Sequence, residues 1–107
     1  EKRPTAVFLA SDHMIPGVYQ AARELGLRIP DDVSVVGFAD LPLASQMDPQ
    51  VTTIRQDPYR IGHRAAKLIL ERLEQAADGD EAEKEKRLIR LAPMLVERAS
   101  TGPVPTK

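Results

Sequence analysis

Three consecutive residues, Ser11, Asp12 and His13, carry the side-chain types of a hydrolytic triad. A triad needs its serine, histidine and acid to face one another, whereas neighbouring residues on a helix point in different directions. The spacing therefore predicts a helix cap made by Ser11 or Asp12 and an exposed His13. No second group is spaced to assist Asp12 or Asp40 as a general acid or base, so we predict no catalytic residue and no enzyme activity.

A second change from apolar to polar residues lies in SVVGFADLP, residues 34–42, where strand-forming residues give way to Ala39, Asp40 and a proline. Loops that leave the carboxyl ends of parallel strands hold ligands in open α/β proteins. The Asp40 carboxylate can accept hydrogen bonds from ligand hydroxyls, or it can cap the turn into Leu41. The residues alone leave both roles open.

The composition argues against several classes of site. The chain has two histidines and no cysteine, and its glycines form no GxGxxG or Walker pattern, so we expect neither a metal nor a nucleotide cofactor. Fifteen Lys and Arg against sixteen Asp and Glu give a formal net charge of -1, which does not favour nucleic-acid binding by this segment. Apolar runs are much shorter than the roughly 20 residues of a membrane span, so we expect no membrane insertion.

The elements that would position these residues begin with a predicted strand over 5–10 and a helix over 13–25. The apolar stripe of that helix contains Met14, Val18, Ala21, Ala22 and Leu25. Gly26 is placed to end the helix in a Schellman motif, and VSVVGF, residues 33–38, predicts a second buried strand. A βαβ unit of this length requires a parallel sheet, so Ser11, Asp12, Ala39 and Asp40 should share one sheet edge and form one wall of a crevice.

The second half of the chain predicts a strand over 51–56 and a long helix from Pro58 to Ala77, with Asp57 as its N-cap. The apolar stripe of this helix consists of Ile61, Ala65, Leu68, Ile69, Leu73 and Ala76. A charged connection follows over 78–87. Residues 88–100 predict one or two strands interrupted at Pro93.

Taken together, these motifs resemble the carboxyl-terminal part of LacI/GalR-family transcriptional regulators. PTAVFLASDHM, ARELGLRIPDDVSVVGFADLPLAS, DPQVTTIRQDPYRIGHRAAKLILERL and LAPMLVERASTGP follow one another in the order of the family. The resemblance covers nearly the whole chain. It implies an effector-sensing domain of the type I periplasmic-binding-protein fold, in which two α/β lobes are joined by three crossing segments around a ligand cleft.

The resemblance implies an α/β fold class, a parallel-sheet βαβ sandwich that forms part of this periplasmic-binding-protein-like fold. It assigns 1–53 to the latter part of the carboxyl-terminal lobe, 54–57 to an inter-lobe crossing, 58–87 to a helix and charged loop of the amino-terminal lobe, and 88–107 to return strands and a tail. The helix-turn-helix and most of both lobes would lie outside this chain, which we expect to be part of a longer protein. Uncovered strand edges and apolar faces would then favour self-association.

The ligand contacts of the family carry over imperfectly onto Ser11, Asp12, Ala39 and Asp40. The residue before Asp12 is often asparagine in relatives, whereas Ser11 is shorter and makes fewer hydrogen bonds. Many sugar-binding relatives have two acids after the aromatic residue of the second strand, and the first of these is replaced here by Ala39. Because Ala39 accepts no side-chain hydrogen bond, three accounts stay open: a less polar effector, a differently anchored one, or the loss of small-molecule control.

The resemblance further places Met14, Val18, Ser45 and Met47 near a dimer interface, although a core role for Met47 is equally open. It implies a cytoplasmic repressor without a cofactor, a homodimer or higher homo-oligomer, that binds a small-molecule effector such as a sugar and, through a helix-turn-helix outside this chain, operator DNA. The effector would act by shifting the population of lobe arrangements. The alternative is an exported solute-binding protein of a sugar ABC transporter, which shares the fold.

Overall fold

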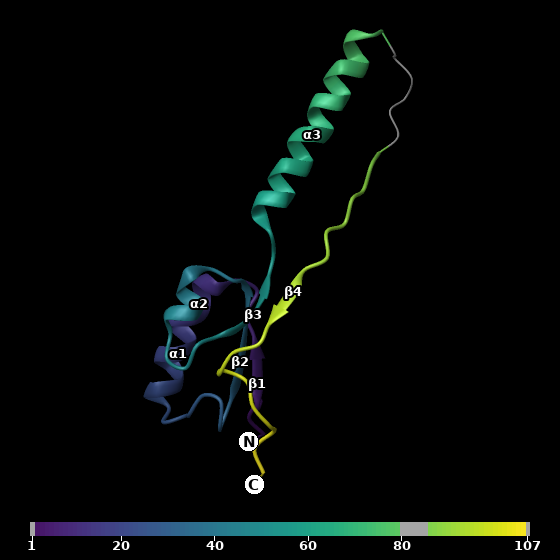
Figure 1. Ribbon diagram of the computed structural model, residues 1–107. Coiled ribbons are helices and arrows are strands. Elements are labelled where there is room, and N and C mark those ends of the chain that lie inside the picture. Colours follow the sequence, from purple (N-terminus) through teal and green to yellow (C-terminus); the bar gives the residue numbers. More distant parts are fainter. Residues whose placement is uncertain (1, 80–85, 107) are drawn as a thin grey trace. The chain divides into compact units, whose positions relative to one another are not determined.

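The sheet order of this protein follows the chain order. The computed structural model describes residues 2–79 and 86–106, in which a four-stranded sheet has the order β1-β2-β3-β4 (Figure 1). The strands are β1 (Ala6–Phe8), β2 (Ser34–Ala39), β3 (Thr52–Arg55) and β4 (Met94–Val96). β1, β2 and β3 are parallel, and β4 pairs with β3 in the antiparallel direction. The prediction of an α/β fold with a parallel βαβ unit is confirmed.

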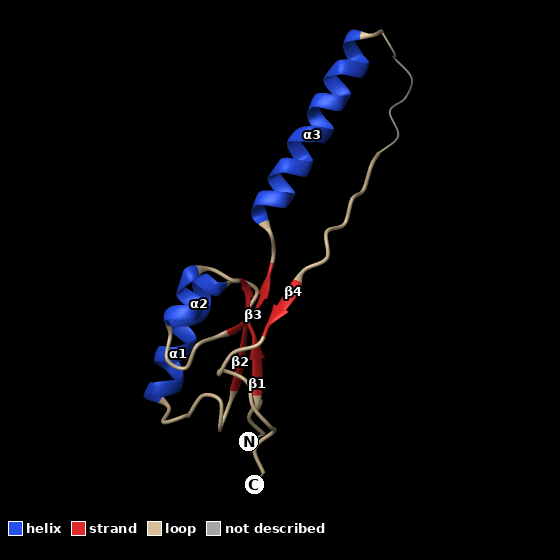
Figure 2. Ribbon diagram, viewed as in Figure 1, coloured by secondary structure: helices blue, strands red, loops and turns tan. Residues whose placement is uncertain are grey.

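The helices are a 3-10 turn η1 (Asp12–Met14), α1 (Ile15–Glu24), α2 (Pro42–Gln46) and α3 (Pro58–Ala77), coloured blue in Figure 2. Two predicted helix ends are confirmed. Gly26 has φ +66°, its amide donates to the Arg23 carbonyl, and the Leu27 amide donates to the Ala22 carbonyl, which is the Schellman pattern. At the start of α3, the Asp57 carboxylate accepts from the Arg60 amide over 3.0 Å.

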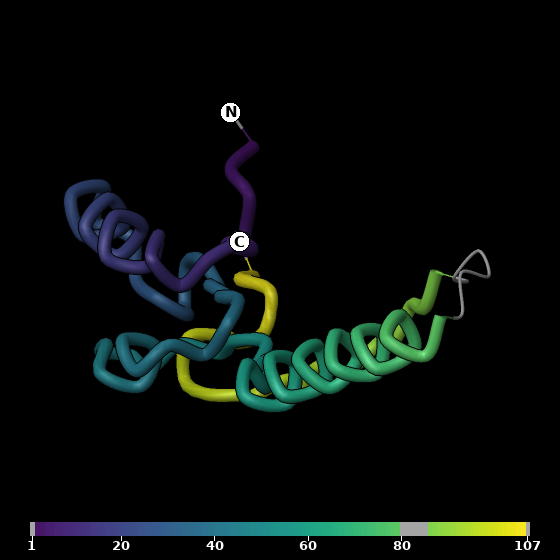
Figure 3. The backbone as a smooth tube through the Cα atoms, turned by 90° about the horizontal axis from the view of Figure 1, so that it is seen from above, coloured from purple at the N-terminus to yellow at the C-terminus, as the bar shows by residue number. Residues whose placement is uncertain are grey.

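α1 and α2 cover one face of the sheet, as the view from above also shows (Figure 3). The core between them consists of Leu9, Ile15, Val35, Ala44 and Val51. Met47 packs against this core and is half-buried. The opposite face carries Phe8 and Phe38, whose rings meet edge to face at 6.4 Å, with Phe8 62% exposed.

The predicted stripe of the first helix was only partly right. Ala22 is buried and Val18 is half-buried, but Met14 is 52% and Leu25 72% exposed. Ile15 is fully buried instead. Met14 lies in the 3-10 turn, which rotates about 120° per residue rather than the roughly 100° of an α-helix and so changes which side chain faces the sheet. Leu25 follows the last residue of α1 as its C-cap.

The segment after β4 returns to the amino-terminal ends of β2 and β3. Ser100 is fully buried there: its carbonyl accepts from the Val35 amide, and its hydroxyl accepts from the Thr52 amide over 2.8 Å. The Ala99 amide donates to the Gln50 carbonyl. These bonds make the return segment part of the same folded unit as β2 and β3. Residues 88–93 are not in a strand, so the predicted one or two strands over 88–100 are one strand, β4.

The chain forms two compact units, one of Glu1–Gln56 with Pro93–Lys107 and one of Asp57–Ala92. In the second unit no described residue of α3 is buried. Its predicted apolar stripe is exposed except for the half-buried Leu68, with Ile69 at 60% and Leu73 at 61%. Arg87 forms an ion pair with Glu71 over 2.7 Å in this unit. Of the predicted charged connection over 78–87, residues 80–85 lie outside the described residues. None of the helices in the described ranges is both long and apolar enough to cross a membrane.

Candidate functional site

The polar residues singled out from the sequence gather at the carboxyl edge of the three parallel strands. Ser11 and Asp12 follow β1, Ala39 ends β2, and Ala39 lies opposite Arg55, the last residue of β3, in the strand register. The parallel pairing brings these strand ends to one edge, as the βαβ pattern predicted. We call this set of residues, together with Asp40 and Arg98, the sheet-edge cluster.

Asp12 is fully buried and its carboxylate is turned into the fold. It accepts from the Leu41 amide over 2.9 Å and from the Thr53 hydroxyl over 3.1 Å. Gly37 lies so close that a β-carbon at this position would overlap the Asp12 Oδ1 atom. The buried carboxylate therefore ties the start of η1 to the loop after β2 and to β3, and it needs glycine at residue 37.

Ser11 acts as the N-cap of η1, since its hydroxyl accepts from the His13 amide over 3.3 Å. Its side chain is half-buried, and His13 is exposed. The predicted cap is thus confirmed in Ser11, while Asp12 belongs to the first turn. Consecutive positions on this turn do not bring the three side chains into a catalytic arrangement.

The backbone at Ala39 and Asp40 is left-handed, with φ of +115° and +57°. Such values are uncommon for residues other than glycine and cost free energy, more so for Ala39 because its φ lies outside the usual left-handed region. The Asp40 amide donates to the Thr53 hydroxyl over 3.4 Å. This reversal of the chain directs the Asp40 side chain toward β3 and the segment after β4.

Asp40 forms ion pairs with two arginines. Its Oδ2 accepts from Arg55 Nε over 2.6 Å and its Oδ1 from Arg98 Nη2 over 2.8 Å. Arg98 also donates to the Val51 carbonyl, and its side chain is 15% exposed against 46% for Arg55. Burial acts to raise the pKa of Asp40, but the hydrogen bonds and charges of both arginines outweigh it, and the pKa lies below its ordinary value.

Sequence reasoning missed three members of this arrangement, Thr53, Arg55 and Arg98. A charged residue at the end of the strand in VTTIRQ was a signal for Arg55, because open α/β proteins in general bind ligands beyond the carboxyl ends of their strands. Arg98 gave no local signal, since it is 58 residues from the carboxylate that it binds. The sequence left two roles open for Asp40, ligand acceptor or cap of the turn. The structure adds a third, in which Asp40 pairs with two guanidinium groups.

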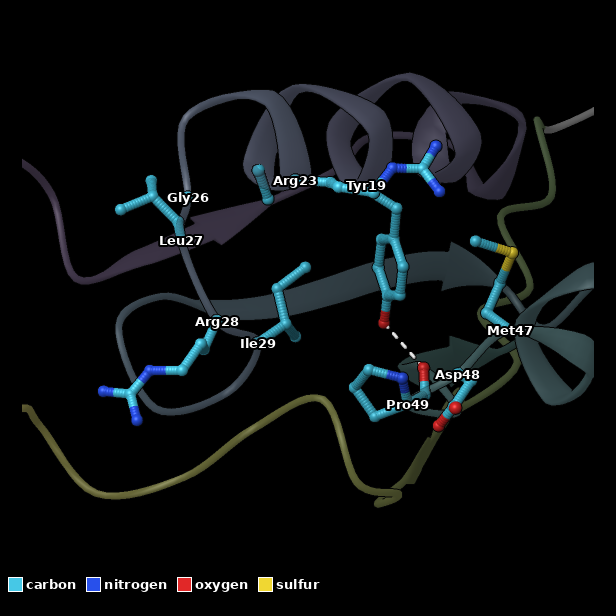
Figure 4. Close-up of a pocket in the computed structure, with 10 residues that line it drawn as sticks. Tyr19, Arg23, Gly26, Leu27, Arg28, Ile29, Met47, Asp48 and Pro49 are labelled. Carbon is cyan, nitrogen blue, oxygen red and sulfur yellow. Dashed lines mark hydrogen bonds between the residues drawn. The ribbon is translucent and has the colours of Figure 1, made fainter.

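A separate hollow of about 480 Å³ lies between α1 and the loops 26–29 and 47–49 (Figure 4). The Tyr19 side chain extends across this hollow, and its hydroxyl donates to the Pro49 carbonyl over 2.8 Å. Burial raises the pKa of Tyr19 to about 12. Met47 lines this hollow, and none of the four predicted ligand residues does.

Within residues 2–79 and 86–106, no group of three or more His, Asp or Glu side chains is placed to hold a metal ion. His63 lies on α3, is exposed and stacks on Tyr59 with ring centroids 6.0 Å apart. The contacts within the sheet-edge cluster are hydrogen bonds and ion pairs.

Comparisons with known proteins agree with this geometry. The model of the periplasmic binding protein-like domain matches residues 1–101. The HTH-type transcriptional repressor PurR of Vibrio atlanticus is 38% identical over 100 residues, 94% of this chain and 28% of that protein. The chain thus spans little more than a quarter of the length of such curated relatives.

Two solved structures show the same arrangement of elements. A LacI family transcriptional regulator from Enterococcus faecalis V583 with bound ribose superimposes with a TM-score of 0.81 at 32% identity, covering 100% of this chain and 37% of that one. The lac repressor dimer bound to operator has a TM-score of 0.70 at 39% identity, covering 92% of this chain and 32% of that one. The predicted resemblance to LacI/GalR-family regulators is confirmed.

Proposed function

Because this chain belongs to the family of periplasmic binding protein-like domains, we propose that it is the effector-sensing and dimerisation segment of a bacterial LacI-family transcriptional regulator. The observation that carries the proposal is the sheet-edge cluster: polar side chains that follow three parallel strands meet at one edge, where this fold binds small molecules. The relatives named above are repressors or regulators, which supports regulation over catalysis. We accordingly propose that the chain has no enzymatic activity.

The organisation into lobes is part of the proposal. Residues 1–53 would belong to the carboxyl-terminal lobe, 54–57 to a crossing between lobes, 58–87 to the amino-terminal lobe and 88–107 to the return. The division of the chain at Gln56 and Asp57 supports a crossing at this point. The same division groups residues 86–92 with α3.

The effector would bind at Ser11, Asp12, Ala39 and Asp40, by different means. Asp12 contributes by fixing the loop, because its own oxygens are turned inward. Ser11 and the backbone of Ala39 lie at the edge itself. The effector class that the relatives suggest is a sugar or a related metabolite, since one solved neighbour holds ribose and another cellobiose.

Dimerisation would use the exposed side of α1 and α2, with Met14, Val18, Ser45 and Met47. Met14 and Ser45 are exposed and so available to a second copy, whereas Val18 and Met47 are half-buried and also pack against the core. Effector binding would then bias the dimer between two arrangements with different affinity for operator DNA, bound through a helix-turn-helix outside this chain in the cytoplasm. An exported solute-binding protein is the second candidate, favoured by the shared fold alone.

The test is DNA selection with the full-length protein. Purified protein is incubated with genomic DNA fragments, the bound fragments are sequenced, and one of them is titrated by fluorescence anisotropy at physiological salt. We expect a defined site, bound at least about 1000-fold more tightly than unrelated DNA. Residues 1–107 alone, with a net charge of -1, serve as the control and should not bind. The absence of sequence-specific binding by the full-length protein would favour the transport protein.

A further inference from the structure

We propose that the effector carries an anionic group, a phosphate or a carboxylate, and that Arg55 recognises it. This inference rests on the proposed function and selects among the three accounts left open by Ala39. It identifies the effector as differently anchored rather than less polar or absent.

The acceptors of the cluster are already occupied. Asp12 is fully buried and bonded to the Leu41 amide and the Thr53 hydroxyl. Both oxygens of Asp40 bind guanidinium groups, and its side chain is 10% exposed. Ala39 has no polar side chain. A neutral polyol donates hydroxyl protons, and carboxylates are the acceptors that bind them most strongly. Each Asp40 oxygen keeps a second lone pair, but the carboxylate is largely shielded from solvent, so the edge presents no open carboxylate to a polyol.

Arg55, by contrast, has hydrogen-bond donors that the cluster leaves unused. Arg55 is 46% exposed and uses only Nε, on Asp40. Among the described residues its two terminal nitrogens have no partner, and together they present a planar pair of donors that matches two oxygens of a phosphate or carboxylate. Asp40 holds this guanidinium in place from the other side. A held and exposed guanidinium loses less conformational freedom when it binds an anion than a free side chain would.

The formal charges of the cluster balance when Asp12 is counted, but the charge that it exposes to solvent is positive. Asp40, Arg55 and Arg98 together carry two positive charges and one negative charge. The further negative charge of Asp12 is fully buried and satisfied by Leu41 and Thr53. The exposed end of the cluster is therefore the Arg55 guanidinium. Charge-assisted bonds from arginine to phosphate or carboxylate are among the stronger hydrogen bonds in proteins.

The experiment compares matched anionic and neutral compounds by titration calorimetry of the full-length protein. Ribose 5-phosphate is paired with D-ribose, and D-gluconate with D-glucose, so that the two pairs distinguish phosphate from carboxylate. We expect one anionic compound to bind at least about 10-fold more tightly than its neutral partner. This preference should decrease as the salt concentration rises.

Substitutions assign the preference to Arg55. Arg55→Gln should remove the preference, so that the anionic compound binds no more tightly than its neutral partner, while Arg98 continues to hold Asp40. Arg55→Lys keeps the charge and should retain part of the preference. Arg28→Gln is the matched control, because Arg28 also pairs with an aspartate, Asp32, but lies outside the cluster. Should neither anion bind better than its neutral partner, or should Arg55→Gln behave like the wild type, the assignment is overturned. Retained operator binding in that case would leave the regulator proposal standing.

Discussion

Replacing Gly37 by alanine tests the role of the buried Asp12 carboxylate. The new methyl group would overlap Asp12 Oδ1 and would also come within 3.3 Å of the Thr53 hydroxyl. Because Asp12 is fully buried in a close-packed region, it cannot move aside without leaving the groups that it binds. We therefore expect the Leu41 amide and the Thr53 hydroxyl to lose their acceptor.

The size of the effect follows from those two bonds. A hydrogen bond to a charged group contributes about 1.5 to 3 kcal/mol, so losing both costs about 3 to 6 kcal/mol. The gain from replacing glycine by alanine in a strand offsets about 0.5 to 1 kcal/mol of this loss. The free energy of unfolding of Gly37→Ala should therefore fall by about 2 to 5 kcal/mol.

Urea denaturation of the full-length protein measures this change, and hydrogen exchange at the Leu41 amide locates it. Gly17→Ala is the matched control, since a β-carbon there meets nothing within 4 Å and α1 should gain up to about 1 kcal/mol. In an Asp12→Ala background, Gly37→Ala should cost much less. A Gly37→Ala protein that unfolds at the wild-type urea concentration, with the Leu41 amide still protected, would refute the reasoning.

Three further predictions concern single residues. Ala39→Gly should raise the free energy of unfolding by about 1 kcal/mol, because glycine tolerates φ of +115°, as urea denaturation will show. The pKa of Asp32 is lowered to about 2 by its hydrogen bonds to Arg28, so its stabilising effect is complete above pH 4 and lost between pH 4 and 2. The melting temperature of Asp32→Asn should therefore decrease less than that of the wild type between about pH 4 and 2. Tyr19→Phe should cost about 1 kcal/mol at pH 7 and weaken the loss of stability above pH 10, because the pKa of Tyr19 is raised to about 12.

Each of these three predictions has an outcome that would contradict it. If Ala39→Gly lowers the free energy of unfolding, the left-handed backbone at this residue carries no strain. If the melting temperature of Asp32→Asn falls at acid pH as steeply as that of the wild type, the pKa of Asp32 is not lowered. Asp31→Asn is the control. Equal alkaline profiles for Tyr19→Phe and the wild type would show that the Tyr19 hydroxyl ionises normally in the folded protein.

Local patterns predicted the elements well because their signals are short in range. The Asp57 cap and the glycine at residue 26 each act within one turn, and both were found where the sequence placed them. The 3-10 turn before α1 was not predicted, since no residue type distinguishes it from the first turn of an α-helix. Ile15 was therefore missed as a core residue.

The site was predicted less completely, for the same reason. Strand order placed Asp12 and Asp40 at one edge, but their partners depend on side-chain packing across the sheet. Thr53 is 41 residues from Asp12, and Arg98 is 58 residues from Asp40. No periodicity connects positions so far apart. Which of the two carboxylates is turned inward and which is paired with arginines thus required the structure.

The return segment at Ser100 has a consequence for synthesis on the ribosome. β2 and β3 obtain the partners of their Val35 and Thr52 amides only when Ser100 has been made, after the whole of Asp57–Ala92. At about 5 to 20 residues per second, the ribosome needs about 2 to 9 s to go from Gln56 to Ser100. During this interval the sheet has an open edge where β4 will pair. The nascent chain should therefore be most vulnerable to aggregation, and most dependent on chaperones, in these seconds.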